Sequence, residues 1–565
     1  MKQTDDFPAA RPRRSHLLLV LFVLAAGSTA CSLMVNTPDR ESPGFAVDSI
    51  RQEDMRADLF FLASDAMNGR AATSRDVAIT SEFIKARFQR LGLIPGGPEN
   101  SYFQTFNLVS AALGDGDNSL VIDGIDTGGL RRRSIGEDYY TLNFSASGSG
   151  SGELAYAGFG IVEPRLGYDD YQGESVEGKI VLVLDREPGV TDPASPFDGV
   201  VTAEQSRDWR KALVAQERGA AGILFVSDVH NRSENTDYTS AAENYWRVSQ
   251  RPRVTLETWM DKIEIPAARV SVQLAERLVA ESGQTLEQLS AGAEPGSGHG
   301  VLAIPGPNVQ INASVNRQAI PARNVLAMVE GSDPDVADEV VIICAHFDHD
   351  GANEQGVFNG ADDDGSGTVA LLDIAEAYAL AAARGEGPRR TVLFAAWDAE
   401  ERGLLGAWYY TEAPTFSLGS TVAVLNMDMI GRNEEVPADG GNRFRGLEPQ
   451  TAESNANAIN IMGYSHSSDL QDEVSEANGQ IGLELKFRYD NNTSNLLRRS
   501  DHWPFLQVGV PATFFHTGLH PDYHRFTDTP DRINYPKMEK IARLVYMTSW
   551  SLANDDGRPS LDRDL

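Results

Sequence analysis

The chain has 565 residues, several times the length of a typical domain, so we expect two or three folded units, each with its own core. With 41% hydrophobic and 23% charged residues, the composition is that of a globular protein and excludes a disordered, fibrous or polytopic membrane chain. The 81 Asp and Glu residues outnumber the 49 Lys and Arg residues, and the resulting net charge of −32 argues against nucleic acid as a partner.

The N-terminal segment, residues 1–31, has the pattern of a secretory signal peptide. Arginines precede an apolar run at 17–26 that is too short to span a bilayer, and small residues then lead to Cys31. This order resembles a bacterial lipoprotein signal, in which Cys31 becomes the lipidated N-terminus. We therefore expect export to the periplasm or outer surface with a lipid anchor. Ser28 stands where that pattern prefers Leu, which leaves ordinary cleavage and release as the alternative.

Cysteine usage bears on how an exported chain is stabilised. Cys344 is the only cysteine besides Cys31, and it lies within an apolar run, so a disulfide framework is excluded. Stability then has to come from the size of the core and from any bound metal.

Two changes of pattern divide the rest of the chain. Residues 45–130 begin with amphipathic helical periodicity, and we assign them to the first part of the main domain. In residues 131–315, Gly, Ser and Asp surround short apolar runs at 179–185 and 221–226, with one helix between the runs. This segment is typical of a smaller β-rich domain inserted into the main one.

Apolar strands and helices alternate from residue 316 to residue 555, the main part of the large domain. We expect strands at 339–345, 390–397, 421–427 and 511–515, and helices at 367–384, 401–410 and 535–553. Such alternation predicts an α/β fold with a mostly parallel, mixed sheet and helices on both faces. The segment 434–482, rich in Asn, Gly, Ser and Glu, is expected to be an excursion of loops that covers a cleft.

Histidines and carboxylates follow the expected strands at their carboxyl ends. They are His346 and Asp348 after the first strand, Glu400 and Glu401 after the second, Asp428 after the third, and His516, His520 and His524 after the fourth. Parallel strand ends meet at one edge of a sheet, so we expect these side chains to lie together. Buried carboxylates are costly unless cations neutralise them, and mixed imidazole and carboxylate ligands suit zinc or its first-row neighbours.

The motifs around these residues resemble, in the same order, those of the co-catalytic dizinc aminopeptidase and glutamate carboxypeptidase family of metallopeptidases. They are the segments 346–348, 360–367, 399–404, 426–432 and 523–529. The inserted segment resembles a protease-associated domain through its runs at 178–183 and 220–226. The likeness covers about residues 45–130 and 320–555 outside the insert.

The resemblance implies two Zn²⁺ ions per chain and a peptide substrate. The family pattern makes His346 and Asp428 ligands of one zinc ion and Glu401 and His524 ligands of the other, with Asp363 bridging both. A shared carboxylate can hold two ions roughly 3.5–4 Å apart, so that together they clamp one water. The preference for His524 over His516 and His520 rests on the Asp-Thr pair that follows it, and Asp362 and Asp364 are expected to cap the next helix.

Three further residues receive roles from the resemblance. Asp348 orients the imidazole of His346, and Glu400 is the general base that takes a proton from a metal-bound water and delivers it to the leaving amine. Tyr523 matches a position that hydrogen-bonds the developing oxyanion. The expected function is that of an exported zinc exopeptidase, with an aminopeptidase favoured over a carboxypeptidase of the glutamate carboxypeptidase type.

Two other functional classes remain open for this scaffold. A glutaminyl cyclase-like transferase shares the fold but resembles a one-zinc site, which the presence of Asp363 and both histidine ligands disfavours. A non-catalytic receptor or adhesion homologue is expected to lack ligands or the base, and here all of them are present. The specificity depends on how a terminal charge is recognised, by acidic groups for an amine or by Arg for a carboxylate.

Overall fold

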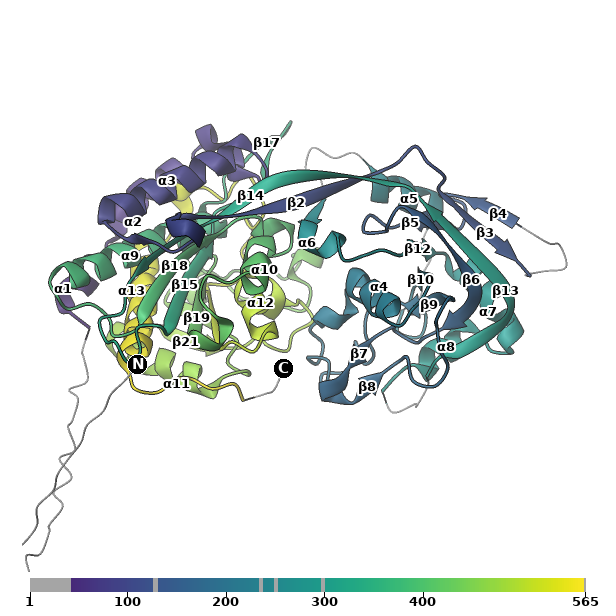
Figure 1. Ribbon diagram of the computed structural model, residues 1–565. Helices are drawn as coiled ribbons and strands as arrows, with labels where there is room; N and C mark the ends of the chain where they lie inside the picture. Colours follow the sequence, from purple (N-terminus) through teal and green to yellow (C-terminus); the bar gives the residue numbers. More distant parts are fainter. Residues whose placement is uncertain (1–41, 125–130, 233–236, 248–252, 296–299, 563–565) are drawn as a thin grey trace, which may run out of the picture. The chain divides into compact units, whose positions relative to one another are not determined.

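Figure 1 shows the computed structural model, which describes residues 42–124, 131–232, 237–247, 253–295 and 300–562. The expected signal segment 1–31, including Cys31, lies outside these residues. The described residues build two large sheets, one of ten strands and one of eight, each with its own helices.

The helical pattern near the N-terminus corresponds to two helices, α2 (Gln52–Leu62) and α3 (Arg75–Leu91). The Ser74 side chain accepts hydrogen bonds from two backbone N–H groups and thereby caps α3, and Gly92 ends the helix with a left-handed φ of 73°. Between the helices, the short segment Asp65–Arg70 turns the chain back toward the main sheet.

The main sheet is mixed, with a parallel centre. Its order is β11 (Val254–Leu256), β2 (Phe103–Leu113), β14 (Val315–Val329), β18 (Thr391–Trp397), β15 (Val340–His346), β19 (Thr421–Met427), β22 (Ala512–His516), β20 (Ala458–Met462) and β21 (Glu484–Phe487), and β1 (Ile94–Pro95) pairs with β14. The four strands β18, β15, β19 and β22 run parallel to one another. Strands β14 and β20 pair antiparallel with this central group.

Helices cover both faces of this sheet (Figure 1). Alternate residues of β15 point to opposite sides, so that Val341 and Ile343 join one core while Ile342 and Cys344 join another. The first core also contains α9 (Gly367–Ala383) and α13 (Tyr535–Asn554), and the second contains α10 (Leu405–Glu412) and α12 (His502–Gln507). The predicted fold class, an α/β domain with a mixed sheet between helices, is confirmed.

The helical stretch Ala361–Ala383, which includes α9, is long and apolar enough to cross a membrane. Its residues are mostly buried against the main sheet, and 72% of its apolar stretch lies inside the protein. The apolar character of this helix therefore follows from its position in the core, where few of its side chains meet solvent.

The smaller sheet has the order β4 (Arg131–Ser134), β3 (Ser119–Asp123), β13 (Leu302–Ala313), β6 (Gly148–Tyr156), β9 (Ile180–Leu184), β10 (Gly222–Val226), β12 (Ala267–Val270) and β5 (Tyr139–Thr141). The helix expected between the two apolar runs is α4 (Asp208–Glu217). Strands β9 and β10 are buried at every position. The long strands β2 and β14 join this sheet to the main one (Figure 1).

Two segments differ from the expectation in their secondary structure. Residues 434–482 are not loops alone, because they contain β20 of the main sheet and α11 (Ser468–Ile481). The single helix expected at 401–410 is instead a short turn at Glu400–Arg402 followed by α10. Gly403 and Leu404, with φ values of 109° and 63°, separate the two, since neither conformation continues a helix. Cys344 is buried and free.

Candidate metal centre

The parallel centre of the sheet places the predicted residues at one edge. His346 is the last residue of β15, Asp428 directly follows β19, and Glu400 follows β18 after a short loop. Because these three strands are neighbours and parallel, their carboxyl ends lie side by side. Asp363 approaches from the loop that leads into α9.

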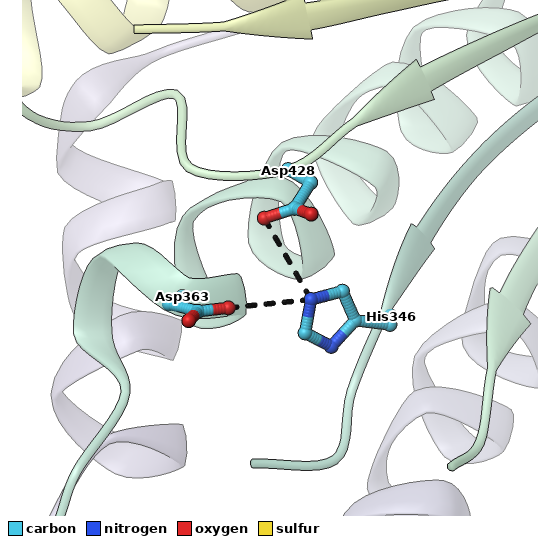
Figure 2. Close-up of side chains that lie close together, drawn as sticks. All are labelled: His346, Asp363 and Asp428. Carbon is cyan, nitrogen blue, oxygen red and sulfur yellow. Dashed lines mark ion pairs between the residues drawn. The ribbon is translucent and has the colours of Figure 1, made fainter. Parts of the chain in front are cut away.

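Figure 2 shows the first group, in which His346 faces Asp363 and Asp428. Its Nε2 lies 3.3 Å from Asp363 Oδ1, 3.7 Å from Asp428 Oδ1 and 3.7 Å from Glu400 Oε2. All four residues are buried. His346 Nδ1 donates to the backbone carbonyl of Asp348, at 3.1 Å, which leaves Nε2 as the nitrogen that faces the carboxylates.

The second group shares Asp363 with the first. His524 Nε2 lies 3.2 Å from Asp363 Oδ2 and 3.6 Å from Glu401 Oε2. The two carboxylate oxygens of Asp363 therefore face different imidazoles, Oδ1 toward His346 and Oδ2 toward His524. One carboxylate between two histidines is the arrangement that a bridging ligand requires.

The other candidate histidines and acids have different partners. His516 Nδ1 donates to the carbonyl of Asp428 at 2.9 Å, and His520 Nε2 donates to Asp362 Oδ2 at 3.1 Å. Asp364 Oδ1 accepts from the N–H of Gly367, the first residue of α9, as a helix cap does. Of the three adjacent acids, the structure thus directs only Asp363 between the two imidazoles.

The donors fit a divalent first-row cation. His346 Nε2 is buried and has no hydrogen-bond partner among the described residues. Burial alone lowers the pKa of a histidine, but the carboxylates of Glu400, Asp363 and Asp428 raise the pKa of His346 well above its usual value. The cluster therefore favours positive charge at this point, and imidazole nitrogens with carboxylate oxygens are the donors that zinc accepts.

The three residues with expected catalytic roles also lie here. Burial raises the pKa of the Glu400 carboxyl well above its ordinary value. The backbone N–H of Glu400 donates to Asp348 Oδ1 at 2.9 Å. Asp348 thus contacts His346 mainly through its carbonyl, since its carboxylate is 3.8 Å from His346 Nδ1. The Tyr523 ring packs edge-on against the His524 ring, with centroids 4.1 Å apart.

A cavity of about 280 Å³ opens on these residues. Its charged and titratable lining consists of Asp363, Glu400, Glu401, Asp428, His516, Tyr523, His524 and three arginines, Arg207, Arg498 and Arg499. Arg207 comes from the inserted segment, and the other two come from the loop before α12. Apart from the predicted ligands and base, the described lining contains no carboxylate.

Sequence reasoning overlooked two residues that contact the second group. His349 Nδ1 lies 2.6 Å from Glu401 Oε1, and His524 Nδ1 donates to Asp350 Oδ2 at 2.8 Å. The only available signal was their position, directly after the motif that ends at Asp348. Neither residue belongs to the motif at 346–348.

Comparison with known proteins identifies both domains. Residues 324–549 match the model of peptidase family M28, and residues 150–278 match that of the PA domain. A probable glutamate carboxypeptidase of Arabidopsis thaliana is 31% identical over 303 residues, which cover 51% of this chain and 38% of that protein. A probable zinc metalloprotease of Pyricularia oryzae is 25% identical over 298 residues, 47% of this chain and 57% of that protein. The chain thus spans less than two thirds of the length of either relative.

Among solved structures, an aminopeptidase from Aneurinibacillus sp. strain AM-1 has a TM-score of 0.47 at 18% sequence identity and covers 92% of this chain and 98% of that chain. The family matches rest on the sequence itself and agree with the order of the five motifs along the main domain. Residues 324–549 therefore belong to the M28 family of zinc peptidases, and the domain inserted before them is a PA domain.

Proposed function

We propose that the chain is a zinc-dependent exopeptidase that holds two zinc ions. His346 and Asp428 would hold one ion, Glu401 and His524 the other, and Asp363 both. The observation that carries this proposal is the position of the Asp363 carboxylate, whose two oxygens lie 3.3 Å and 3.2 Å from the Nε2 atoms of His346 and His524. Glu400, placed 3.7 Å from His346 Nε2, adds the one carboxylate that a hydrolase needs beyond its ligands.

Zinc, when bound, supplies a Lewis acid that polarises the scissile carbonyl and makes water a stronger nucleophile near neutral pH. Glu400 accepts the proton of the attacking water and returns it to the nitrogen of the leaving amine. Asp348 accepts a hydrogen bond from the backbone N–H of Glu400. This bond would hold the base at a fixed distance from the substrate. Tyr523, which lines the cavity beside His524, would donate a hydrogen bond to the developing oxyanion.

The general base is tested by Glu400→Gln, which keeps the shape of the side chain and removes its proton-accepting role. We expect kcat to fall by about 10²–10⁴-fold, while the zinc content measured by mass spectrometry stays unchanged. Glu217→Gln, at an exposed position at the end of α4, is the matched control and should leave kcat unaltered. Full activity of the Glu400 variant would exclude the proposed mechanism.

Removal of the N-terminal residue, the aminopeptidase activity expected from the motifs, is the first candidate for the reaction. A specific observation favours carboxypeptidase activity as the second. Arg499 lines the cavity and is exposed, and its guanidinium has no ion-pair or hydrogen-bond partner among the described residues. An unpaired guanidinium is well suited to a terminal carboxylate, and the glutamate carboxypeptidase relative agrees with this reading.

Peptides blocked at one end distinguish the two candidates. An aminopeptidase should cleave a C-amidated tripeptide and reject its N-acetylated counterpart, whereas a carboxypeptidase should show the opposite preference. Under the second candidate, Arg499→Leu should raise KM for peptides with a free carboxylate and leave KM for amidated peptides unchanged. Release of pyroglutamyl peptide from an N-terminal glutamine substrate, without a free amino acid, would instead support a cyclase-like transferase.

We also propose that the protein is exported and anchored by a lipid on Cys31. This proposal rests on the N-terminal sequence pattern alone. Fractionation of expressing cells should recover the wild-type chain with membranes and the Cys31→Ser variant in the soluble fraction. Recovery of both chains as soluble exported protein would favour ordinary signal cleavage.

A further inference from the structure

Two adjacent residues outside the five-ligand pattern face the second metal group. His349 is fully buried, and its Nδ1 lies 2.6 Å from Glu401 Oε1. Asp350 Oδ2 accepts from His524 Nδ1 at 2.8 Å. The two contacts use Glu401 Oε1 and His524 Nδ1, whereas Glu401 Oε2 and His524 Nε2 face each other, 3.6 Å apart. His524 Nε2 also faces Asp363, and His349 Nδ1 lies 3.8 Å from Asp363 Oδ2.

The local fold leaves a fitted space for the His349 imidazole. Gly360 has a φ of 55°, and a Cβ added there would lie 2.5 Å from His349 Cγ and 2.6 Å from its Cδ2. The backbone N–H of His349 donates to the carbonyl of Arg70 at 3.1 Å, which fixes the start of the side chain. The segments that contain Gly360 and Arg70 therefore form the space that the His349 imidazole fills.

The Asp350 contact determines which nitrogen of His524 is available. A carboxylate can only accept, so Nδ1 of His524 carries a proton, and Nε2, which faces Asp363 and Glu401, is the nitrogen left to bind a metal ion once its own proton is displaced. His349 contacts Glu401 as an ion pair, with its Nδ1 2.6 Å from Oε1, while Oε2 of the same carboxylate faces His524. Groups that orient metal ligands from behind in this way commonly change metal affinity by about 10–100-fold when they are removed.

We propose that His349 and Asp350 are positioning residues for the second zinc ion, holding Glu401 and His524 in the orientation in which both can bind it. Consecutive residues of one loop would thus set the affinity of that ion separately from the first. The inference rests on the proposed two-zinc exopeptidase, since it concerns ligands of the second ion only. It gives the His-Asp pair after Asp348 a role that the family motif does not include.

The test measures stepwise zinc binding to the full chain by competition with a chromophoric chelator. For His349→Leu and Asp350→Ala, we expect the first zinc to bind as in the wild type and the second to bind about 10–100-fold more weakly. Asp350→Asn keeps an acceptor oxygen for His524 Nδ1 and should recover part of the loss. His230→Leu and Asp531→Ala, which exchange exposed residues of the same types, are the controls and should bind both ions normally.

Cobalt substitution supplies a readout that a general loss of stability would not produce. With Co²⁺ in both sites, the visible absorption of the second ion should change in the His349 and Asp350 variants, while that of the first stays constant. Because His349 is buried, thermal unfolding verifies that its variant folds, and the partly exposed Asp350 gives an independent result. Wild-type binding of the second ion by both variants overturns this inference alone. A wild-type chain that binds a single zinc overturns the proposed function and the inference with it.

Discussion

The individual side chains of the centre show how strongly the metal-free cluster attracts positive charge. Burial alone lowers the pKa of His524, yet Glu401, Asp350 and Asp363 raise it to about 10. His346 is shifted in the same direction by its own carboxylates. Without cations, both imidazoles therefore carry protons at neutral pH, and zinc has to displace them.

This displacement predicts a steep pH dependence of zinc affinity. Each proton that zinc releases strengthens apparent binding by about tenfold per pH unit, as long as the pH is below the raised pKa of that histidine. We expect the affinity to rise continuously from pH 6 to pH 9, because the pKa of His524 is about 10. Competition titrations at several pH values measure the slope. A slope of zero above pH 7 would contradict the raised pKa values.

The places of single residues in the centre were predictable from the sequence where a motif named them, and only there. The five ligand positions and Glu400 come together as the motifs implied. The contacts of His349 and Asp350 depend on how their loop folds back over Arg70 and Gly360. That tertiary packing has no local signature, so neither residue could be assigned beforehand.

At the scale of the elements, one buried arginine joins the segments that carry the ligands. Arg70 donates to the carbonyls of Leu62, Phe347, Asn359 and Gly360 at distances of 2.7–3.0 Å. These carbonyls belong to the end of α2, the loop after β15 and the loop before α9. The guanidinium thus fixes the loop of His346 relative to the loop of Asp363.

Replacement of this guanidinium should destabilise the fold. Arg70→Met leaves four carbonyls without their donor, and we expect the free energy of unfolding to fall by about 3 kcal/mol or more. Urea denaturation of the zinc-free chain measures the effect. Arg75→Met, an exposed arginine at the start of α3, is the control and should change stability by less than about 0.5 kcal/mol. Equal stability of the two variants would show that Arg70 is not a structural link.

Helix α9 contains a buried acid that predicts a pH-dependent stability. Burial, with a smaller effect of Asp54, raises the pKa of Asp373 to about 8. In the unfolded chain this carboxyl has its ordinary pKa of about 3.9, so its ionisation favours unfolding as the pH rises from about 4 to about 8. Asp373→Asn removes this dependence. The difference in Tm between the variant and the wild type, measured by calorimetry, should therefore favour the variant more at pH 8 than at pH 5.

The elements themselves were predictable to different degrees. The apolar strands 339–345, 390–397 and 421–427 coincide closely with β15, β18 and β19, because each is fully buried and bounded by polar residues. Strand β20 was overlooked within the polar segment 434–482. Antiparallel pairing with β22, more than fifty residues further along the chain, holds β20 in the sheet. A local sequence pattern does not encode such a pairing.

For the molecule as a whole, the insert contributes directly to the cavity of the M28 domain. Glu204, from the insert, accepts from Arg498 Nη2 at 2.8 Å and from Trp503 Nε1 at 3.0 Å, and it also pairs with Arg207. Arg498 and Arg207 both line the cavity. One buried carboxylate therefore holds two of the three arginines that line the cavity.

Loss of this carboxylate should affect stability and substrate binding together. In Glu204→Ala, the largely buried Arg498 loses its counter-charge, so we expect the free energy of unfolding to fall by about 3 kcal/mol. Freed from Glu204, both arginines can move in the cavity, and KM should rise several-fold while kcat changes little, because Glu400 and the metal ligands do not contact Glu204. Steady-state kinetics with calorimetry measure both effects, and Glu217→Gln serves as control. A fall in kcat at constant KM would instead show that the insert acts on the chemical step.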